Sequence, residues 1–236
     1  MLVTALSSAE MTQQLHDNAD QLREAGKTLE ALDLYNRVIV NYQMAGNYQG
    51  ILNALTGRVI SWQHLYNPSK DRVFAVFAQK DVEAMVEIAK EHNITEKQHT
   101  IQFLLGKAKM LLKDYAGAEK AFKLATEMYP EKNAESGDWI AHYGEAIYRN
   151  GKKEEGIHMI LFGLDTIQKL SAGVEPFLLE VWTSGANLRL ATLLYEDKRP
   201  KEAQVYLSLA KAIIDHNPKL VVRTRQLEAL ENIIQP

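Results

Sequence analysis

The sequence predicts an all-α protein built as an array of helical hairpins. Small residues recur in the middle of amphipathic stretches, and glycine and proline recur where turns between helices are needed. No useful stretch alternates apolar and polar residues with the period of a strand. The predicted breakers inside hairpins are Gly26, Gly151 and Pro200, and those between hairpins are Pro130, Gly137, Pro176 and Pro218.

We divide the chain into five hairpins and a capping helix that form one repeat domain over residues 1–236. The predicted hairpins span residues 9–44, 47–92, 96–129, 136–171 and 176–215, and the capping helix spans 219–234. At the front, Ser7 and Glu10 have the spacing of a capping box, which would start the first helix. After the break at Asn67-Pro68-Ser69 the second hairpin has no clear register.

The spacing of the small residues suggests a duplication. One small residue marks the middle of each predicted first helix, at Ala19, Gly57, Gly106, Gly144, Ala191 and Ala229. These positions lie 38, 49, 38, 47 and 38 residues apart, so short and long steps alternate. We interpret the alternation as a duplicated pair of hairpins. The alternative is that glycine and alanine are common enough for six such positions to arise by chance.

The clearest unit, residues 99–130, carries a recognisable pattern. Its marks are Leu105-Gly106, then Lys113-Asp114-Tyr115, then Ala118, Phe122, Ala125 and Pro130. This pattern resembles the tetratricopeptide repeat. The resemblance implies a right-handed α-solenoid whose first helices line a concave groove that binds proteins or peptides.

Composition limits the classes of partner. The chain has 27 basic and 30 acidic residues, a formal charge of −3, which gives no positive field for a nucleic acid. It has no cysteine, which excludes a disulfide framework and a thiolate nucleophile. Its start lacks the pattern of a signal peptide, and no apolar run reaches the roughly 20 residues that span a bilayer. We therefore expect a cytoplasmic protein that binds neither nucleic acid nor membrane.

The sequence lacks the common catalytic and cofactor-binding motifs, so we predict a protein that is not an enzyme and holds no cofactor or metal. There is no phosphate-binding glycine loop, no H-E-x-x-H and no G-x-S-x-G. The seven histidines never pair at a helical spacing of three or four residues. A helical enzyme would need residues that converge only in the folded chain, and this alternative stays open.

The candidate binding residues are those expected to face the groove. They are Arg58, Trp62, Phe103, Lys107, Met110, Tyr148, Arg189 and Tyr195. Aromatic and apolar side chains with added positive charge would suit a peptide that carries an acidic group and an apolar anchor. The alternative is that the apolar members pack between neighbouring helices and the charges are solvated.

Two further expectations concern partners. Some tetratricopeptide domains hold a terminal carboxylate with Lys and Asn, but His16, Asp20 and Leu55 stand at the corresponding positions here, so that clamp is not expected. A second hypothesis is a structural protein that assembles with copies of itself into a homo-oligomer. It would use an end of the array, such as the apolar flank Leu220-Val221-Val222. A third is a peptide-sensing regulatory domain of a signalling system.

Overall fold

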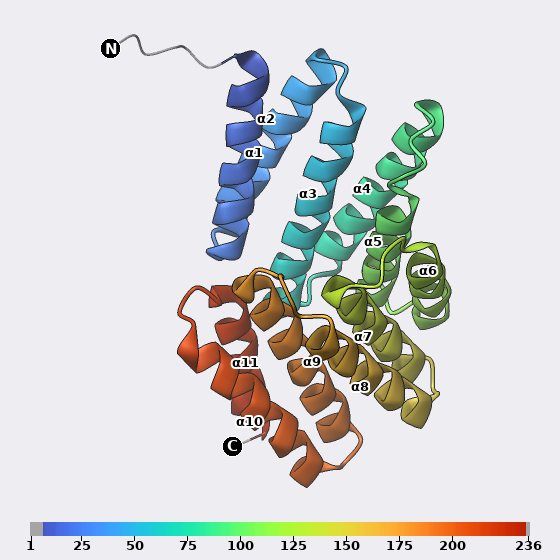
Figure 1. Cartoon of the computed structure of the whole chain (residues 1–236), viewed down its shortest axis with the longest axis vertical. Coiled ribbons are helices and arrows are strands. Elements are labelled where there is room, and N and C mark those ends of the chain that lie inside the picture. Colours follow the sequence, from blue (N-terminus) through green and yellow to red (C-terminus); the bar gives the residue numbers. More distant parts are fainter. Residues whose placement is uncertain (1–6, 235–236) are drawn as a thin grey trace. The chain divides into compact units, whose positions relative to one another are not determined.

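The computed structural model describes residues 7–234 and is all-α, with no strand among these residues (Figure 1). The chain forms two compact units that divide between Leu112 and Lys113, here called unit 1 and unit 2. Within each unit, helices that follow one another along the chain pack together. The predicted class, an all-α array of helical hairpins, is therefore confirmed.

Unit 1 contains five helices whose core is continuous. They are α1 (Ser8–Glu24), α2 (Thr28–Met44), α3 (Tyr48–Ser69), α4 (Arg72–Glu91) and α5 (Gln98–Leu111). The helix α3 packs against α2 and α4, and it also contacts the other first helices, α1 and α5. The largest fully buried side chains of this core include Tyr35, Leu52 and Met85. The capping box is confirmed, because Glu10 N–H donates to Ser7 Oγ and Ser7 N–H donates to the Glu10 carboxylate.

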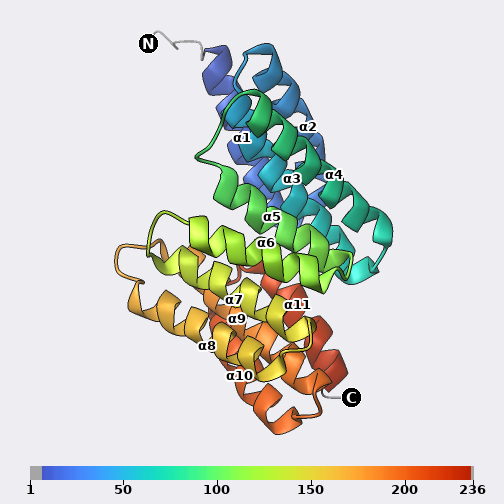
Figure 2. The ribbon, with the colours of Figure 1, turned by 90° about the vertical axis from the view of Figure 1, so that its right-hand side faces the viewer.

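Unit 2 contains six helices. They are α6 (Tyr115–Met128), α7 (Ala134–Arg149), α8 (Lys153–Lys169), α9 (Pro176–Glu196), α10 (Pro200–His216) and α11 (Val221–Ile234). Figure 2 shows α7 and α8 lying side by side, and these two helices share the most extensive packing of the unit. The helix α11 packs on both α9 and α10, with Leu227 and Leu230 of the helix and Leu220 just before it in the core.

The helix bounds follow the predicted hairpins closely. Each hairpin and the final helix begin and end within two residues of the predicted limits. The boundary between the units falls inside the hairpin predicted for residues 96–129, so its helices α5 and α6 belong to different units. The interpretation of the whole chain as one cooperative repeat domain stays a prediction.

Four tight turns between helices share one backbone conformation. Gly26, Gly46, Gly151 and Lys198 have φ values of 70°, 66°, 96° and 61°. The N–H that follows each of them donates to a carbonyl five residues earlier, as in Arg199 to Leu194 at 2.9 Å. Glycine adopts positive φ without a steric penalty, whereas Lys198 is held there by the turn.

We expect Lys198→Gly to stabilise unit 2 by about 0.5–1 kcal/mol, because glycine relieves the left-handed strain but has more freedom to lose on folding. Chemical denaturation followed by circular dichroism measures the change. Lys201→Gly is the control, since Lys201 lies inside α10 and glycine there should cost about 1 kcal/mol. Equal destabilisation by both substitutions would show that Lys198 is not strained.

The packing of α7 on α8 depends on four glycines. A Cβ at Gly137 would lie 2.6 Å from the Gly163 carbonyl oxygen, and one at Gly144 would lie 2.8 Å from the Gly156 carbonyl oxygen. The backbones of the two helices therefore touch where the glycines meet. The prediction that Gly137 breaks the chain between hairpins is wrong. It lies inside α7, where its missing side chain lets α8 approach.

Gly57 and Gly144, the small residues that mark the middle of two first helices, have different packing partners. A Cβ at Gly144 would meet Ile160 of α8, the second helix of the same hairpin. A Cβ at Gly57 would instead meet the Tyr35 ring of α2, in the preceding hairpin. The two glycines face different neighbours, so the alternating spacing counted through Gly57 does not support a duplicated pair.

Candidate binding surface

The predicted groove residues Arg58 and Trp62 lie between α3 and α4. The Arg58 guanidinium donates to both Asp81 carboxylate oxygens, at 2.8 and 2.5 Å, and Trp62 Nε1–H donates to Asp81 at 2.8 Å. Asp81 is buried, and Arg58 also bonds to Asn36 of α2 at 2.8 Å. The charge of Arg58 is thus balanced inside unit 1, and both side chains face the second helices.

The other predicted residues of unit 1 lie on α5. Phe103 is buried, and the Lys107 ammonium lies 5.3 Å from the centre of its ring. Met110 is half-buried at the end of the same helix. The i, i+4 spacing of Phe103 and Lys107 brings them together as a cation–π pair.

In unit 2 the predicted residues join neighbouring first helices. The Tyr148 hydroxyl of α7 donates to the Leu193 carbonyl of α9 at 3.0 Å, and the Tyr195 hydroxyl of α9 donates to the Ile233 carbonyl of α11 at 2.9 Å. Arg189 Nε–H donates to Glu145 of α7 at 2.6 Å. These three side chains are therefore committed to holding α7, α9 and α11 together.

The predicted residues thus do not form one surface but fall into three separate sets. Arg58 and Trp62 meet at Asp81, Phe103 and Lys107 meet on α5, and the α7–α9 contacts belong to the other unit. Both arginines are paired with carboxylates, so neither supplies the free positive charge that an acidic peptide would need. The sequence analysis did not predict a role for Asp81. A carboxylate between the apolar residues Ala78 and Met85 could have indicated a buried ion pair.

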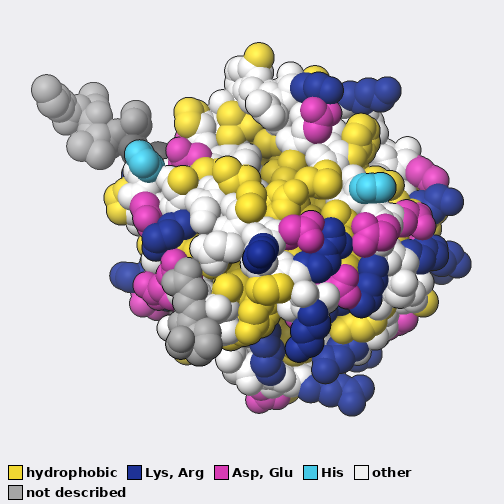
Figure 3. Space-filling model, turned by 90° about the horizontal axis from the view of Figure 1, so that it is seen from below, with side chains coloured by type: hydrophobic (Ala, Val, Ile, Leu, Met, Phe, Trp, Pro, Cys, Tyr) yellow, Lys and Arg dark blue, Asp and Glu magenta, His cyan; other side chains and the backbone are white. Residues whose placement is uncertain are grey.

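Charge pairing extends over the hairpin turns of unit 2. Arg149 pairs with Glu196, Lys152 with Glu119, Lys153 with Asp197, and Arg199 with Glu154. Figure 3 shows acidic and basic side chains beside one another on the face it draws. Exposed pairs of this kind contribute little stability individually, but together they leave few uncompensated charges.

The helix α3 instead exposes an uncharged polar stripe. Its exposed or half-exposed residues recur at helical spacing, at Gln49, Asn53, Thr56, Ile60 and Gln63. Between Gln49 and Gln63 the other side chains are buried, apart from the two that bond to Asp81. Arg58 is the only Lys, Arg, Asp or Glu in α3, so this face of the helix carries no formal charge.

Exposed carboxamides also recur along α1. Thr12, His16 and Ala19 of α1 are buried toward α2, and Gln14, Asn18 and Gln21 are exposed on the side away from it, together with the charged Asp17. The helices α1 and α3 contact one another, so both sets of carboxamides lie on adjacent first helices of unit 1. We call them the amide face, which consists of Gln14, Asn18, Gln21, Asn53 and Gln63.

The amide face has a definite hydrogen-bonding character. Each carboxamide carries two N–H donors and a carbonyl acceptor, the same functional groups as a peptide bond. In the part of the chain that the structure describes, these five side chains are not engaged in hydrogen bonds with other residues. These carboxamides can therefore pair with the backbone of an extended polypeptide without requiring a charge on it.

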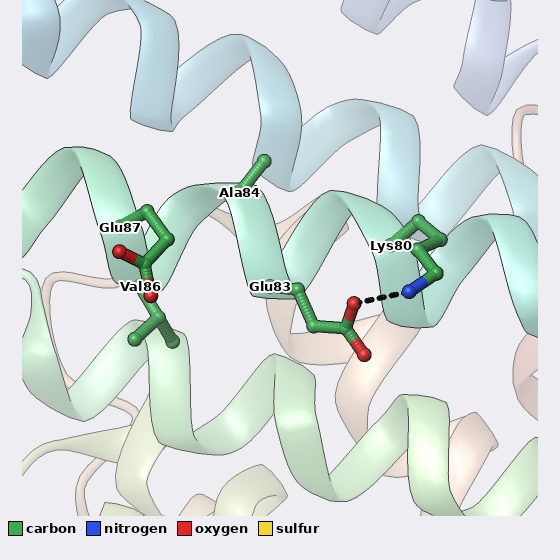
Figure 4. Close-up of a pocket in the computed structure, with 5 residues that line it drawn as sticks. All are labelled: Lys80, Glu83, Ala84, Val86 and Glu87. Carbon is green, nitrogen blue, oxygen red and sulfur yellow. Dashed lines mark hydrogen bonds and ion pairs between the residues drawn. The ribbon is translucent and has the colours of Figure 1, made fainter.

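A depression on the surface of α4 is a weaker candidate for a binding site. It is lined by Lys80, Glu83, Ala84, Val86 and Glu87, all from α4 (Figure 4). Lys80 and Glu83 pair across it at 2.7 Å. A depression with walls from a single helix is shallow and cannot enclose a small molecule.

A buried histidine links α1 to α2. The His16 ring packs edge-on against the rings of Tyr35 and Tyr42, at centroid distances of 6.0 and 5.8 Å. The Tyr42 hydroxyl donates to Gln13 at 3.0 Å, so it accepts from Nδ1–H of His16 at 3.3 Å. Burial lowers the pKa of His16, while the charges of Asp20 and Asp17 partly oppose this shift.

This shift predicts a pH dependence of stability. With its pKa lowered in the folded state, His16 takes up a proton first in the unfolded chain, whose ordinary pKa is about 6.5. Its contribution is present above that pH and is lost as the pH falls toward the lower folded pKa. We expect His16→Gln to flatten stability between pH 7 and 5, measured by urea denaturation. His158→Gln, at an exposed histidine of α8, is the control, and an unchanged slope for His16→Gln would contradict the prediction.

None of the helices in residues 7–234 is long and apolar enough to cross a membrane. Over the same residues, no three His, Asp or Glu side chains are grouped to hold a metal ion. The chain matches no protein-family model and no curated protein.

Proposed function

We propose that this chain is a non-enzymatic, cytoplasmic scaffold of the tetratricopeptide type that binds a protein or peptide on the amide face of unit 1. The observation that carries the proposal is the row of unoccupied carboxamides on two adjacent first helices. Such side chains bond to a peptide backbone whatever the sequence of the peptide, so they suit an extended segment of another protein.

The partner differs from the one first expected. Because Arg58 and Arg189 are paired with Asp81 and Glu145, an acidic group on the partner finds no free guanidinium there. The proposed partner is therefore an extended segment recognised mainly through its backbone. Half-exposed Ile60, between Thr56 and Gln63, supplies an apolar contact beside the amides.

The test uses peptides selected from a random display library on the immobilised full chain. Their affinity is then measured for wild type and for the double variant Asn53→Ala/Gln63→Ala. Loss of two hydrogen bonds should weaken binding about tenfold or more, at about 1 kcal/mol each.

The matched control is Gln43→Ala, which removes an exposed carboxamide from the second helix α2. It should leave the affinity unchanged. The proposal fails if the double variant binds as tightly as this control. It also fails if no peptide is selected.

A further inference from the structure

The turn between α7 and α8 contains the one Asn-Gly pair of the sequence, Asn150-Gly151. Asn150 caps the C-terminus of α7 and is exposed, and Gly151 is exposed with a φ of 96°. A Cβ added to Gly151 would have no atom within 4 Å, so the space beside the turn is open. Water and hydroxide therefore have free access to the backbone at this turn.

An asparagine that precedes a glycine can lose its side-chain nitrogen. The glycine backbone nitrogen gives its proton to hydroxide and attacks the side-chain carbonyl carbon, Cγ, of the asparagine. As the new N–Cγ bond forms, the Cγ–Nδ2 bond breaks, and the nitrogen takes a proton from water and leaves as ammonia. Water then opens the resulting succinimide ring at either carbonyl, which gives aspartate or isoaspartate. Glycine favours the attack because it has no side chain to obstruct it.

In the folded chain, hydrogen bonds hold both reacting groups. The Nδ2 amide of Asn150 donates to Glu119 Oε2 at 2.7 Å, and Gly151 N–H donates to the Tyr148 carbonyl at 3.0 Å. Ring closure swings Cγ of Asn150 toward the Gly151 nitrogen and draws Nδ2 away from Glu119. Both hydrogen bonds must therefore open before the two atoms can react.

The carboxylate of Glu119 is well placed to hold Asn150. Glu119 lies on α6, its side chain is only 16% exposed, and its second oxygen, Oε1, accepts from Lys152 Nζ at 2.6 Å. Burial raises the pKa of Glu119, but the bonds from Lys152 and Asn150 lower this pKa by more, so the carboxyl group stays ionised near neutral pH. Glu119 is thus a fixed, charged acceptor on a neighbouring helix.

We propose that Asn150-Gly151 is a site of spontaneous deamidation whose rate is set by the hydrogen bond from Asn150 to Glu119. The product weakens the turn that contains it. Aspartate places a second carboxylate beside Glu119 and a negative charge at the C-terminus of α7, and both are unfavourable. Isoaspartate also lengthens the backbone by one carbon, which disrupts the bond from Lys152 N–H to the Ile147 carbonyl at 3.2 Å. The site lies in unit 2 and does not depend on the proposed binding by unit 1.

Incubation of the full chain at pH 8 tests the proposal, with asparagine, aspartate and isoaspartate at position 150 separated by peptide mapping and mass spectrometry. Glu119→Leu has no acceptor and should convert about fivefold faster than wild type, the effect of losing one hydrogen bond. Glu119→Gln is the matched control. It removes the same charge and the same ion pair with Lys152 but keeps a carbonyl acceptor for Asn150, so its rate should stay close to that of wild type. The proposal is overturned if Asn150 stays intact in Glu119→Leu, or if this variant converts no faster than Glu119→Gln.

A second measurement tests the weakened turn and does not depend on how well Glu119→Leu folds. Asn150→Asp should unfold at a lower urea concentration than Asn150→Ala, because alanine also removes the donor but adds no charge beside Glu119. Combining Asn150→Asp with Glu119→Gln should recover part of this difference, since the like-charge pair is then absent. An Asn150→Asp chain as stable as Asn150→Ala would overturn the proposed effect of deamidation on the turn.

Discussion

Gly144→Ala should destabilise unit 2 by about 3 kcal/mol, because there is no room for a methyl group between α7 and α8. The added Cβ would lie 2.7 Å from the backbone nitrogen of Ile160 and 2.8 Å from the carbonyl oxygen of Gly156. Both are backbone atoms, so relief requires the helices to separate, and forced separation of a packed interface costs about 1–3 kcal/mol or more. The better helix propensity of alanine offsets only about 1 kcal/mol.

Urea denaturation followed by tryptophan fluorescence measures this effect. Trp139 and Trp182 report on unit 2, and Trp62 is the single tryptophan of unit 1, so Trp62→Phe isolates the signal of unit 2. The control is Gly185→Ala in α9, where the nearest atoms belong to the guanidinium at the end of the Arg223 side chain rather than to a helix backbone. Its effect should stay below about 1 kcal/mol. Similar losses for the two variants would contradict the close α7–α8 contact.

Asp81→Ala should destabilise unit 1 by about 3–4 kcal/mol. Asp81 accepts two hydrogen bonds from Arg58 and one from Trp62, and its removal leaves a partly buried guanidinium without its counter-charge. Removing one partner of a buried ion pair costs about 3–5 kcal/mol, and the remaining exposure of Arg58 places the estimate toward the lower end.

Two comparisons sharpen this test, with stability measured by urea denaturation. Glu83→Ala removes an exposed ion pair with Lys80 and should leave the stability almost unchanged. The double variant Arg58→Leu/Asp81→Leu should lose less stability than Asp81→Ala, because it leaves no unpaired charge. If the double variant is less stable than Asp81→Ala, the unpaired guanidinium is not the main reason why Asp81→Ala loses stability.

The sequence predicts the helix bounds well because the turns depend on local chemistry. Gly26 and Gly151 take positive φ, Pro176 and Pro200 occupy the first turn of their helices, and Ser7 caps α1 through its own side chain. Each signal acts within a few residues and needs no knowledge of distant contacts.

The sequence predicts the facing of the helices less well, because α3 has neighbours on several sides. It packs on α2 and α4 and contacts α1 and α5, so its buried residues do not mark one narrow stripe. From the sequence alone, Gly57 could contact either α2 or α4. The structure shows that it faces the Tyr35 ring of α2. Arg58 follows Gly57 in the sequence. A prediction that orients Gly57 toward the wrong neighbour therefore also places Arg58 in the groove, whereas in the structure Arg58 bonds to Asp81.

The amide face was missed for a related reason. Asparagine and glutamine on a helix surface are common, and Asn53 and Gln63 stand out only because their neighbours in α3 are buried. Asn18 lies on another helix, and the contact between α1 and α3 is recorded by no local pattern. An uncharged stripe in a chain with 24% charged residues was the one signal available.

The most direct test of binding at the amide face is a titration of the isotope-labelled chain with a library-selected peptide, followed by nuclear magnetic resonance of the side-chain amide groups. The account predicts that the NH₂ signals of Asn18, Asn53 and Gln63 shift with one common affinity, while that of Gln43 stays in place. Shifts confined to the second helices α2 and α4, with unchanged signals from Asn53 and Gln63, would contradict it.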